Sequence, residues 1–259
     1  MLILLPPSEG KTAPVRGAAL RPDSLSFPAL RQPREQMLHA LVSLCTTHGA
    51  EAAETLGLGP TQAGEVERNA DLREAPTARA DRIYSGVLYE ALDLTSLDQS
   101  ARGRAARWLT VTSGLFGLLR PTDRIPAYRL SGSVTLPGVG SVSGYWARHL
   151  DPVVTEAAGS GLVVDLRSST YASFWRPAPA RRERVVTLRV LHEVNGTRKV
   201  VSHFNKATKG RLVRDLLREG TTPRTTVRFA DHLGDLGWKV ETGPPGRHGT
   251  RLDVVVDEV

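Results

Sequence analysis

The chain begins with Leu2-Ile3-Leu4-Leu5-Pro6-Pro7-Ser8-Glu9-Gly10-Lys11-Thr12, in which a short apolar run is followed by a polar loop. The apolar run stops at two prolines, which predicts a buried strand over residues 2–5. Ligands of α/β sheets commonly bind beyond the carboxyl ends of such strands. We therefore expect Ser8, Glu9 and Lys11 to form part of an anion- or ligand-binding site, unless this segment is simply a solvated loop.

Helical and strand-like patterns follow one another along the rest of the chain. Apolar residues have helical spacing over residues 34–92, whereas the second half contains apolar runs that are typical of strands. These runs are at residues 134–136, 162–165, 185–194, 199–203, 225–229 and 252–256, with helices expected at 145–158, 206–219 and 230–236. No repeat or long linker divides the chain. The sequence thus predicts an α/β fold of the mixed α+β type, with a mixed sheet and surrounding helices in a single domain over residues 1–259.

The composition excludes several classes of protein. A chain of 259 residues with 40% hydrophobic and 24% charged residues is unlike a disordered, collagen-like or coiled-coil sequence. The single cysteine, Cys45, rules out an intramolecular disulfide and suits a reducing, cytoplasmic location. The apolar run at the N-terminus is too short for a signal peptide or a membrane span. No histidine pair has the spacing of metal ligands, so we expect no metal. We also expect no cofactor and no membrane partner.

Positive charge is concentrated in one part of the chain. The net charge is +7, and residues 161–220 contain thirteen lysines and arginines against five acidic residues. Such a region suits phosphate-bearing partners, although an arginine-rich composition can also serve solubility alone. Only five of the basic residues are lysines, at positions 11, 199, 206, 209 and 239. Their scarcity points to a chemical role for individual lysines.

Two of these lysines, Lys206 and Lys209, begin a predicted helix with Asn205 as its N-cap. A helical projection places both on the apolar face, where a charge is unfavourable unless it meets water or an anion. An anion-binding cleft would satisfy both lysines, and the alternative is that carboxylates such as Asp165 or Asp123 neutralise them. The outer side of the same helix carries arginines: Arg211, Arg214 and Arg218.

Further candidates for an anion site follow two other apolar segments. Arg120, Asp123, Tyr128 and Arg129 come after the segment at residues 108–119, and guanidinium groups match phosphate and carboxylate geometry. The alternative is that Asp123 merely pairs with an arginine. The hydroxyl side chains after residues 162–165 are suited to a ligand or to capping the next element: Ser168, Ser169 and Tyr171.

Catalytic residues cannot be assigned from a motif. No nucleophile elbow and no acid/base pair of carboxylates is present in the sequence. If the protein is an enzyme, the candidates are Lys206, Lys11 and Asp123.

Residues 53–66 have the pattern of a helix, a glycine-rich turn and a second helix. This pattern is similar to a helix-hairpin-helix element, whose glycines let backbone amides approach a DNA phosphate. On this interpretation the DNA contacts are expected from Gly57, Gly59 and Gln62, together with the outer Arg211 and Arg214. The alternative is a plain turn between helices with a glycine C-cap.

Several of these segments together resemble the YaaA family of bacterial peroxide stress proteins. The resemblance runs nearly end to end, through residues 1–11, 84–89, 113–123, 128–130 and 202–210. The loop Pro6-Pro7-Ser8-Glu9-Gly10-Lys11 is similar to the actinobacterial branch of the family and differs from the Ser-Pro-Ala-Lys form of the enterobacterial branch.

The resemblance implies a single α/β domain with a positively charged cleft and a helix-hairpin-helix-like element. It also implies DNA binding that depends on structure rather than sequence, and a cytosolic role in limiting oxidative damage. It implies no reaction. An enzyme acting on a small anionic or nucleotide-like substrate in the same cleft is therefore the alternative.

Overall fold

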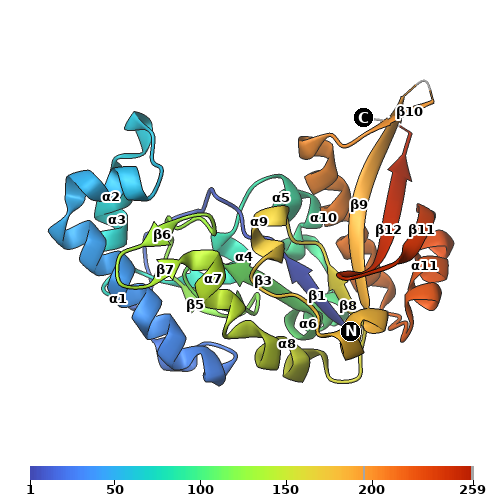
Figure 1. The fold of residues 1–259 in the computed structure, drawn as a ribbon, viewed down its shortest axis with the longest axis horizontal. Helices are drawn as coiled ribbons and strands as arrows, with labels where there is room; N and C mark the ends of the chain where they lie inside the picture. Colours follow the sequence, from blue (N-terminus) through green and yellow to red (C-terminus); the bar gives the residue numbers. More distant parts are fainter. Residues whose placement is uncertain (195, 258–259) are drawn as a thin grey trace.

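A mixed sheet of eight strands runs through the molecule (Figure 1). The computed structural model describes residues 1–194 and 196–257. The five inner strands are parallel, in the order β12, β9, β8, β1 and β3, and β11, β4 and β10 pair antiparallel with β12, β3 and β9. Their bounds are β1 Leu2–Leu5, β3 Leu109–Ser113, β4 Gly117–Leu119, β8 Val163–Asp165, β9 Val185–Val194, β10 Thr197–Lys199, β11 Lys239–Gly246 and β12 Gly249–Val256.

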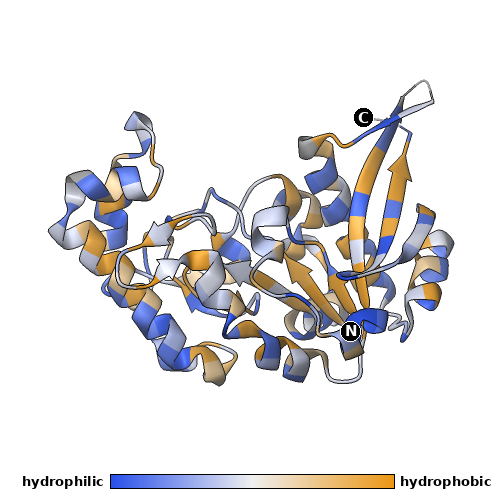
Figure 2. Ribbon diagram, in the orientation of Figure 1, coloured by the Kyte–Doolittle hydropathy of each residue, from blue (hydrophilic) through white to orange (hydrophobic). Residues whose placement is uncertain are grey.

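Helices cover both faces of this sheet, as the apolar inner strands require. Alternate residues of β1 enter two separate cores, with Leu2 and Leu4 in one and Ile3 and Leu5 in the other. The first core is completed by α1 (Arg31–Thr47), α7 (Val142–Ala147) and α8 (Leu150–Ala158). The second is completed by α5 (Val87–Leu92), α6 (Gln99–Trp108), α10 (Ser202–Glu219) and α11 (Thr226–Asp235). Figure 2 shows the inner strands as mostly apolar and the helices as two-sided.

Short elements connect these layers. The remaining helices are α2 (Gly49–Thr55), α3 (Gly64–Ala70), α4 (Ala80–Ile83), α9 (Ser169–Ala172) and five 3-10 turns: η1 Pro22–Ser24, η2 Pro28–Leu30, η3 Pro60–Gln62, η4 Leu94–Ser96 and η5 Pro179–Arg184. Two small ribbons pair β2 (Ala78–Arg79) with β5 (Arg124–Ile125) and β6 (Thr135–Leu136) with β7 (Gly140–Ser141). In Figure 1, α1, α2 and α3 form one end of the molecule, and β11 with α11 forms the other.

The predicted mixed sheet with surrounding helices is confirmed, but two predicted strands are wrong. Residues 225–229 lie at the start of α11, because the Thr225 side chain accepts a hydrogen bond from the Arg228 amide and Phe229 and Leu233 bury one helical face. Residues 199–203 divide between β10 and α10, which begins at Ser202. Asn205 therefore lies inside the first turn of α10 and is not its N-cap.

Within residues 1–194 and 196–257, no helix is both long enough and apolar enough to cross a membrane.

Candidate functional site

A pocket of about 800 Å³ opens where β1 and β8 end, beside the start of α10. The connection from β1 leads to β3 on one side, whereas the connection from β8 leads to β9 on the other. In an α/β sheet, ligands usually bind beyond the carboxyl ends of two adjacent parallel strands whose connections lead to opposite sides of the sheet. The pocket is lined by residues 6–10, 85–89, 166–169 and 188–189 with Tyr171, Asn205, Lys206 and Lys209.

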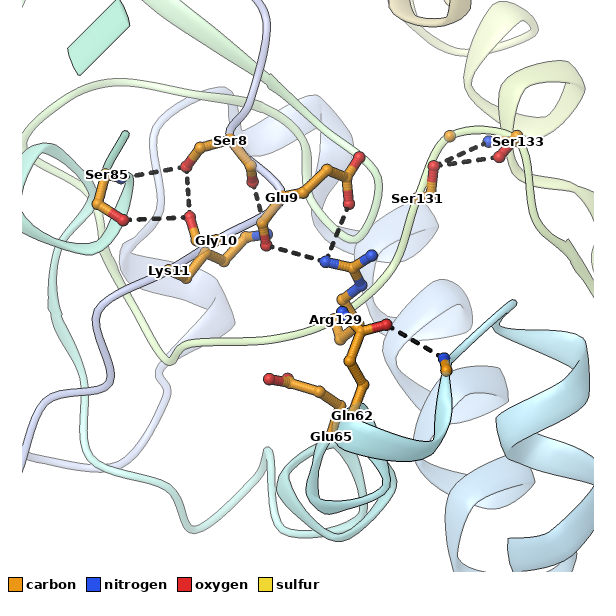
Figure 3. Close-up of polar contacts among 12 residues, drawn as sticks. Ser8, Glu9, Gly10, Lys11, Gln62, Glu65, Ser85, Arg129, Ser131 and Ser133 are labelled. Atoms are coloured by element: carbon orange, nitrogen blue, oxygen red, sulfur yellow. Dashed lines mark hydrogen bonds and ion pairs between the residues drawn. The ribbon is translucent and has the colours of Figure 1, made fainter. Parts of the chain in front are cut away.

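The loop after β1 is fixed by its own hydrogen bonds (Figure 3). The Ser8 hydroxyl donates to the Gly10 carbonyl at 2.6 Å and accepts the Ser85 amide at 3.1 Å. The Lys11 ammonium donates to the Ser8 carbonyl at 2.9 Å, and the Tyr89 hydroxyl donates to the carbonyl of Pro6. These contacts tie the loop to residues 84–89, so one wall of the pocket is preorganised.

Lys11 lies beneath this wall and does not line the pocket. Its ammonium is 4.2 Å from the centre of the Tyr128 ring and 5.6 Å from that of Tyr84. Burial lowers the pKa of Lys11 to about 8, against the opposing effect of Glu9, and Arg129 lowers it further. Lys11 therefore acts as a support for the loop.

The Lys11 pKa gives the stability a definite pH dependence. Because the folded-state pKa is about 8 and the ordinary value is 10.5, the unfolded chain binds more protons between these values. The contribution of Lys11 to stability therefore rises with pH in this window. We expect the difference in unfolding free energy between the wild type and Lys11→Met to rise from about pH 8 to about pH 9.5, by at most about 1.4 kcal/mol per pH unit. Urea unfolding of both proteins measures it, and a flat difference would contradict this environment.

Glu9 is the one carboxylate among the pocket-lining residues, all of which belong to the described part of the chain. One carboxylate oxygen lies 3.5 Å from the Arg129 guanidinium, and the other accepts the Tyr171 hydroxyl at 3.4 Å. Figure 3 shows Arg129 reaching Glu9 from outside the loop. The Tyr171 hydroxyl also accepts the Gly132 amide, and burial together with the Glu9 charge raises the pKa of Tyr171. Glu9 is thus already balanced by a cation.

Two of the four cations that line the pocket are neutralised by carboxylates. Arg167 is fully buried at its side chain and makes two hydrogen bonds to Asp165, at 2.8 and 2.7 Å. It also donates to two backbone carbonyls. Arg189 makes a similar pair with Asp253, at 2.8 and 2.6 Å. Both arginines therefore have structural partners.

The other two cations, Lys206 and Lys209, have no carboxylate partner among the described residues. Lys209 is half-buried and donates to the Leu166 carbonyl at 3.2 Å. Burial lowers its pKa, and Asp165 partly offsets this. Lys206 is exposed, rather than directed inward as predicted, yet it lines the pocket without a hydrogen bond or ion pair to any described residue. The alternative was that Asp165 or Asp123 neutralises these lysines. Neither forms an ion pair with them, because Asp165 is paired with Arg167 and Asp123 accepts the backbone amides of Ser26 and Arg120.

The opposite side of the pocket carries free hydroxyls. Ser168 is the N-cap residue of α9, but its side chain makes no capping hydrogen bond. Ser169 follows it, and both are exposed in the pocket wall without a side-chain partner in the described part of the chain. These hydroxyls are therefore available to a ligand.

Comparison with known proteins gives the same family that the sequence resembles. Residues 1–237 match the family described as "Peroxide stress protein YaaA". The chain belongs to this family. It is 52% identical to a UPF0246 protein of Streptomyces coelicolor over the full length of both chains. It is 41% identical to a UPF0246 protein of Corynebacterium efficiens, and the match covers 98% of this chain and all of that protein. It is 27% identical to an uncharacterized protein of Campylobacter jejuni, and that match covers 82% of this chain and 83% of the other protein.

In this YaaA-family chain, five predicted anion-site residues do not line the pocket. Lys11 and Arg129 contact its loop as described above, and the other three have different partners. Arg120 donates to the carbonyls of Arg107 and Leu109 near the amino end of β3, opposite the end where the pocket opens. Asp123 accepts the backbone amides of Arg120 and Ser26, so it holds two loops together. Tyr128 is buried, and its hydroxyl bonds those of Tyr84 and Ser113. Local sequence spacing does not show that Arg120 lies at the amino end of β3.

The glycine-rich turn expected to contact DNA has a structural explanation. Gly57 has a φ of 63°, and its amide donates to the Glu54 carbonyl. The Leu58 amide donates to the Ala53 carbonyl. These two hydrogen bonds and the positive φ form a Schellman C-cap of α2. The Gly59 amide donates to the Gln62 side chain at 3.2 Å and is therefore occupied. Residues 49–70 of this YaaA-family chain contain four glutamates and one arginine.

The arginines assigned to DNA on the outer side of α10 differ from each other. Arg211 is exposed. Arg214, predicted to face outward, instead donates to the carbonyls of Leu92 and Asp93 at the end of α5. Two pocket segments of this YaaA-family member, residues 85–89 and 188–189, are not predicted from the sequence. Their polar character is weak, and only the fold brings them to the ends of β1 and β8.

Proposed function

We propose that this protein acts in the peroxide stress response by binding a small anionic, nucleotide-like ligand in the pocket between β1, β8 and α10. One observation carries the proposal: Lys206 and Lys209 line an open pocket of about 800 Å³ without a carboxylate partner among the described residues. Volumes of this order are typical of sites that enclose a small molecule. A bound anion would complete the charge balance of the pocket.

The character of the other walls supports an anion with an apolar or planar body. Glu9 is balanced by Arg129, and the two lining arginines by aspartates, so the remaining charge is positive. The hydroxyls of Ser168 and Ser169 can donate to phosphate oxygens. The rest of the lining is largely apolar, from Pro6, Val87, Leu88, Leu166 and Leu188. This division suits a phosphate at one end of the ligand and a ring at the other.

Removing the Lys206 charge is the direct test of ligand binding. We expect one or more of inorganic pyrophosphate, adenosine monophosphate and pyridoxine 5′-phosphate to bind in calorimetric titration. Lys206→Ala should weaken that binding by about tenfold or more, as expected for a charge-assisted hydrogen bond. Arg211→Ala, which removes an exposed charge from the same helix outside the pocket, should change it by less than about twofold. Binding by none of the three compounds, or equal loss in both variants, would contradict the proposal.

DNA binding is a second candidate, and a group of arginines around the amino end of β9 favours it. Arg181, Arg182 and Arg184 of η5 precede β9, and Arg176 and Arg247 lie nearby. Burial, then Arg247, Arg176 and Arg182, lowers the pKa of His248, so these charges share one neighbourhood. None of the five arginines pairs with a carboxylate among the described residues. Unpaired guanidinium groups are suited to backbone phosphates.

The salt dependence of DNA affinity separates this surface from the turn at residues 57–59. If the arginines contact phosphates, the affinity for duplex DNA should fall with salt, with a slope of about 0.9 per phosphate neutralised. The double variant Arg182→Glu/Arg184→Glu should reduce this slope, whereas Gly59→Val should leave it unchanged, because Gly59 has an ordinary φ of −77°. Loss of binding in Gly59→Val alone would instead assign the contacts to the turn, and a salt-independent affinity would contradict DNA binding.

A further inference from the structure

Lys209 occupies an environment that differs from those of the other lysines. Its side chain is half-buried between α10 and the end of β8, and its ammonium has a single hydrogen bond in the described part of the chain, to the Leu166 carbonyl. The carboxylate whose charge acts on it, Asp165, accepts hydrogen bonds from Nε and Nη2 of Arg167. Lys209 nevertheless lines the pocket, so a ligand can reach it. It is thus a lysine without an ion pair to any described residue, at the edge of an open pocket.

The charged groups around Lys209 leave its ammonium without an ion pair in the described part of the chain. Arg167 and Arg189 belong to ion pairs, and Glu9 is bound to Arg129. Lys206 precedes it by one helical turn and is free to take an anion. Burial shifts the equilibrium of Lys209 toward the neutral amine, which is the nucleophilic form. An apolar pocket with a second cation next to a desolvated lysine is the arrangement that activates lysines for imine formation.

We propose that Lys209 is a nucleophile that forms an imine with an anionic carbonyl compound, whose phosphate or carboxylate is held by Lys206. This inference rests on the proposed function, because it names the substrate class for the same pocket. The class is an aldehyde or ketone that carries an anionic group at one end.

The chemistry needs no oxidant, reductant or metal. The nitrogen lone pair of Lys209 attacks the carbonyl carbon, and the C–O double bond becomes a hydroxyl when a proton moves from nitrogen to oxygen. The hydroxyl then leaves as water together with the second proton of the nitrogen, and the nitrogen electron pair forms the C=N bond of the imine. The hydroxyls of Ser168 and Ser169 line the same pocket and can hydrogen-bond the departing oxygen.

The small number of lysines makes trapping unambiguous. The full-length protein is incubated with substoichiometric pyridoxal 5′-phosphate, which is a phosphate-bearing aldehyde, and then with borohydride, which reduces the imine to a stable amine. Peptide mass spectrometry compares labelling at Lys209 with that at Lys11, Lys199, Lys206 and Lys239. We expect Lys209 to be labelled at least about tenfold faster than Lys199 and Lys239, because binding holds the aldehyde beside it.

Matched variants and a competitor keep the outcomes separate. Lys209→Arg retains the charge but has no imine-forming amine, so it should bind pyridoxine 5′-phosphate, the corresponding alcohol, and lose the pocket label. In the wild type the same alcohol should suppress labelling at Lys209. Equal labelling of all lysines, or labelling at Lys206 in place of Lys209, would overturn the inference. If the alcohol phosphate still binds in that case, the proposed function survives. If labelling is even and the alcohol fails to bind as well, both are contradicted.

Discussion

Replacing Gly210 by alanine is expected to destabilise the protein by about 1–3 kcal/mol, although alanine is the better helix former. Gly210 lies in α10 where that helix crosses α5, and an added Cβ would meet the Leu88 carbonyl oxygen at 2.3 Å and the Leu92 nitrogen at 3.0 Å. These are backbone atoms, so the helices must separate. The helix-propensity gain of about 1 kcal/mol is smaller than the cost of such overpacking.

The effect should extend to the pocket, because Lys206 and Lys209 lie in the turn before Gly210. Chemical unfolding and ligand titration of Gly210→Ala measure the two effects. Gly234→Ala is the matched control, since Gly234 is also helical, in α11, and has open space around it. This control should gain up to about 1 kcal/mol. A stabilised Gly210→Ala would show that the crossing of α10 and α5 is not as close as described.

Arg167→Met is expected to be at least as costly, at about 3–5 kcal/mol, because it leaves the Asp165 carboxylate buried without its partner. The side chains of Arg167 and Asp165 are only 1% and 10% exposed, and two backbone carbonyls also lose their donor. These carbonyls, from Tyr171 and Trp175, fix the segment that carries Ser168 and Ser169. Both unfolding free energy and ligand affinity should therefore fall.

Arg198→Met provides the comparison for an exposed ion pair. Arg198 bonds Glu193 and Glu241 on the surface, with 37% of its side chain exposed. Its loss should cost no more than about 1 kcal/mol. If urea unfolding gives similar losses for Arg167→Met and Arg198→Met, the pair of Arg167 with Asp165 does not organise the pocket.

Periodicity predicted those parts of the fold whose residues form a local pattern. The apolar run of β1 is buried on both faces, so its sequence alone identifies a central strand and the loop that follows it. The helical face of Lys209 could be predicted in the same way. The sequence favoured a strand at residues 225–229, but the structure has a helix there, because the capping contact of Thr225 outweighs the strand propensity of its neighbours.

Contacts between distant segments decided which candidates share the pocket. The sequence near Arg120 resembles an anion site, but the guanidinium satisfies backbone carbonyls near the amino end of β3. Asp123 is likewise engaged by Ser26, almost a hundred positions earlier. Ser85 and Arg189 reach the pocket through the order of the strands, which no local spacing encodes.

A crystal structure with bound ligand tests the central claim most directly, namely that the pocket at the ends of β1 and β8 takes an anion. Crystals would be grown with adenosine monophosphate or pyridoxine 5′-phosphate, whichever binds more tightly in solution. We predict density for the phosphate within hydrogen-bond distance of the Lys206 ammonium and of the Ser168 or Ser169 hydroxyl, with the ring against Leu166 and Leu188. A phosphate bound at the arginines of η5 with an empty pocket would contradict this account.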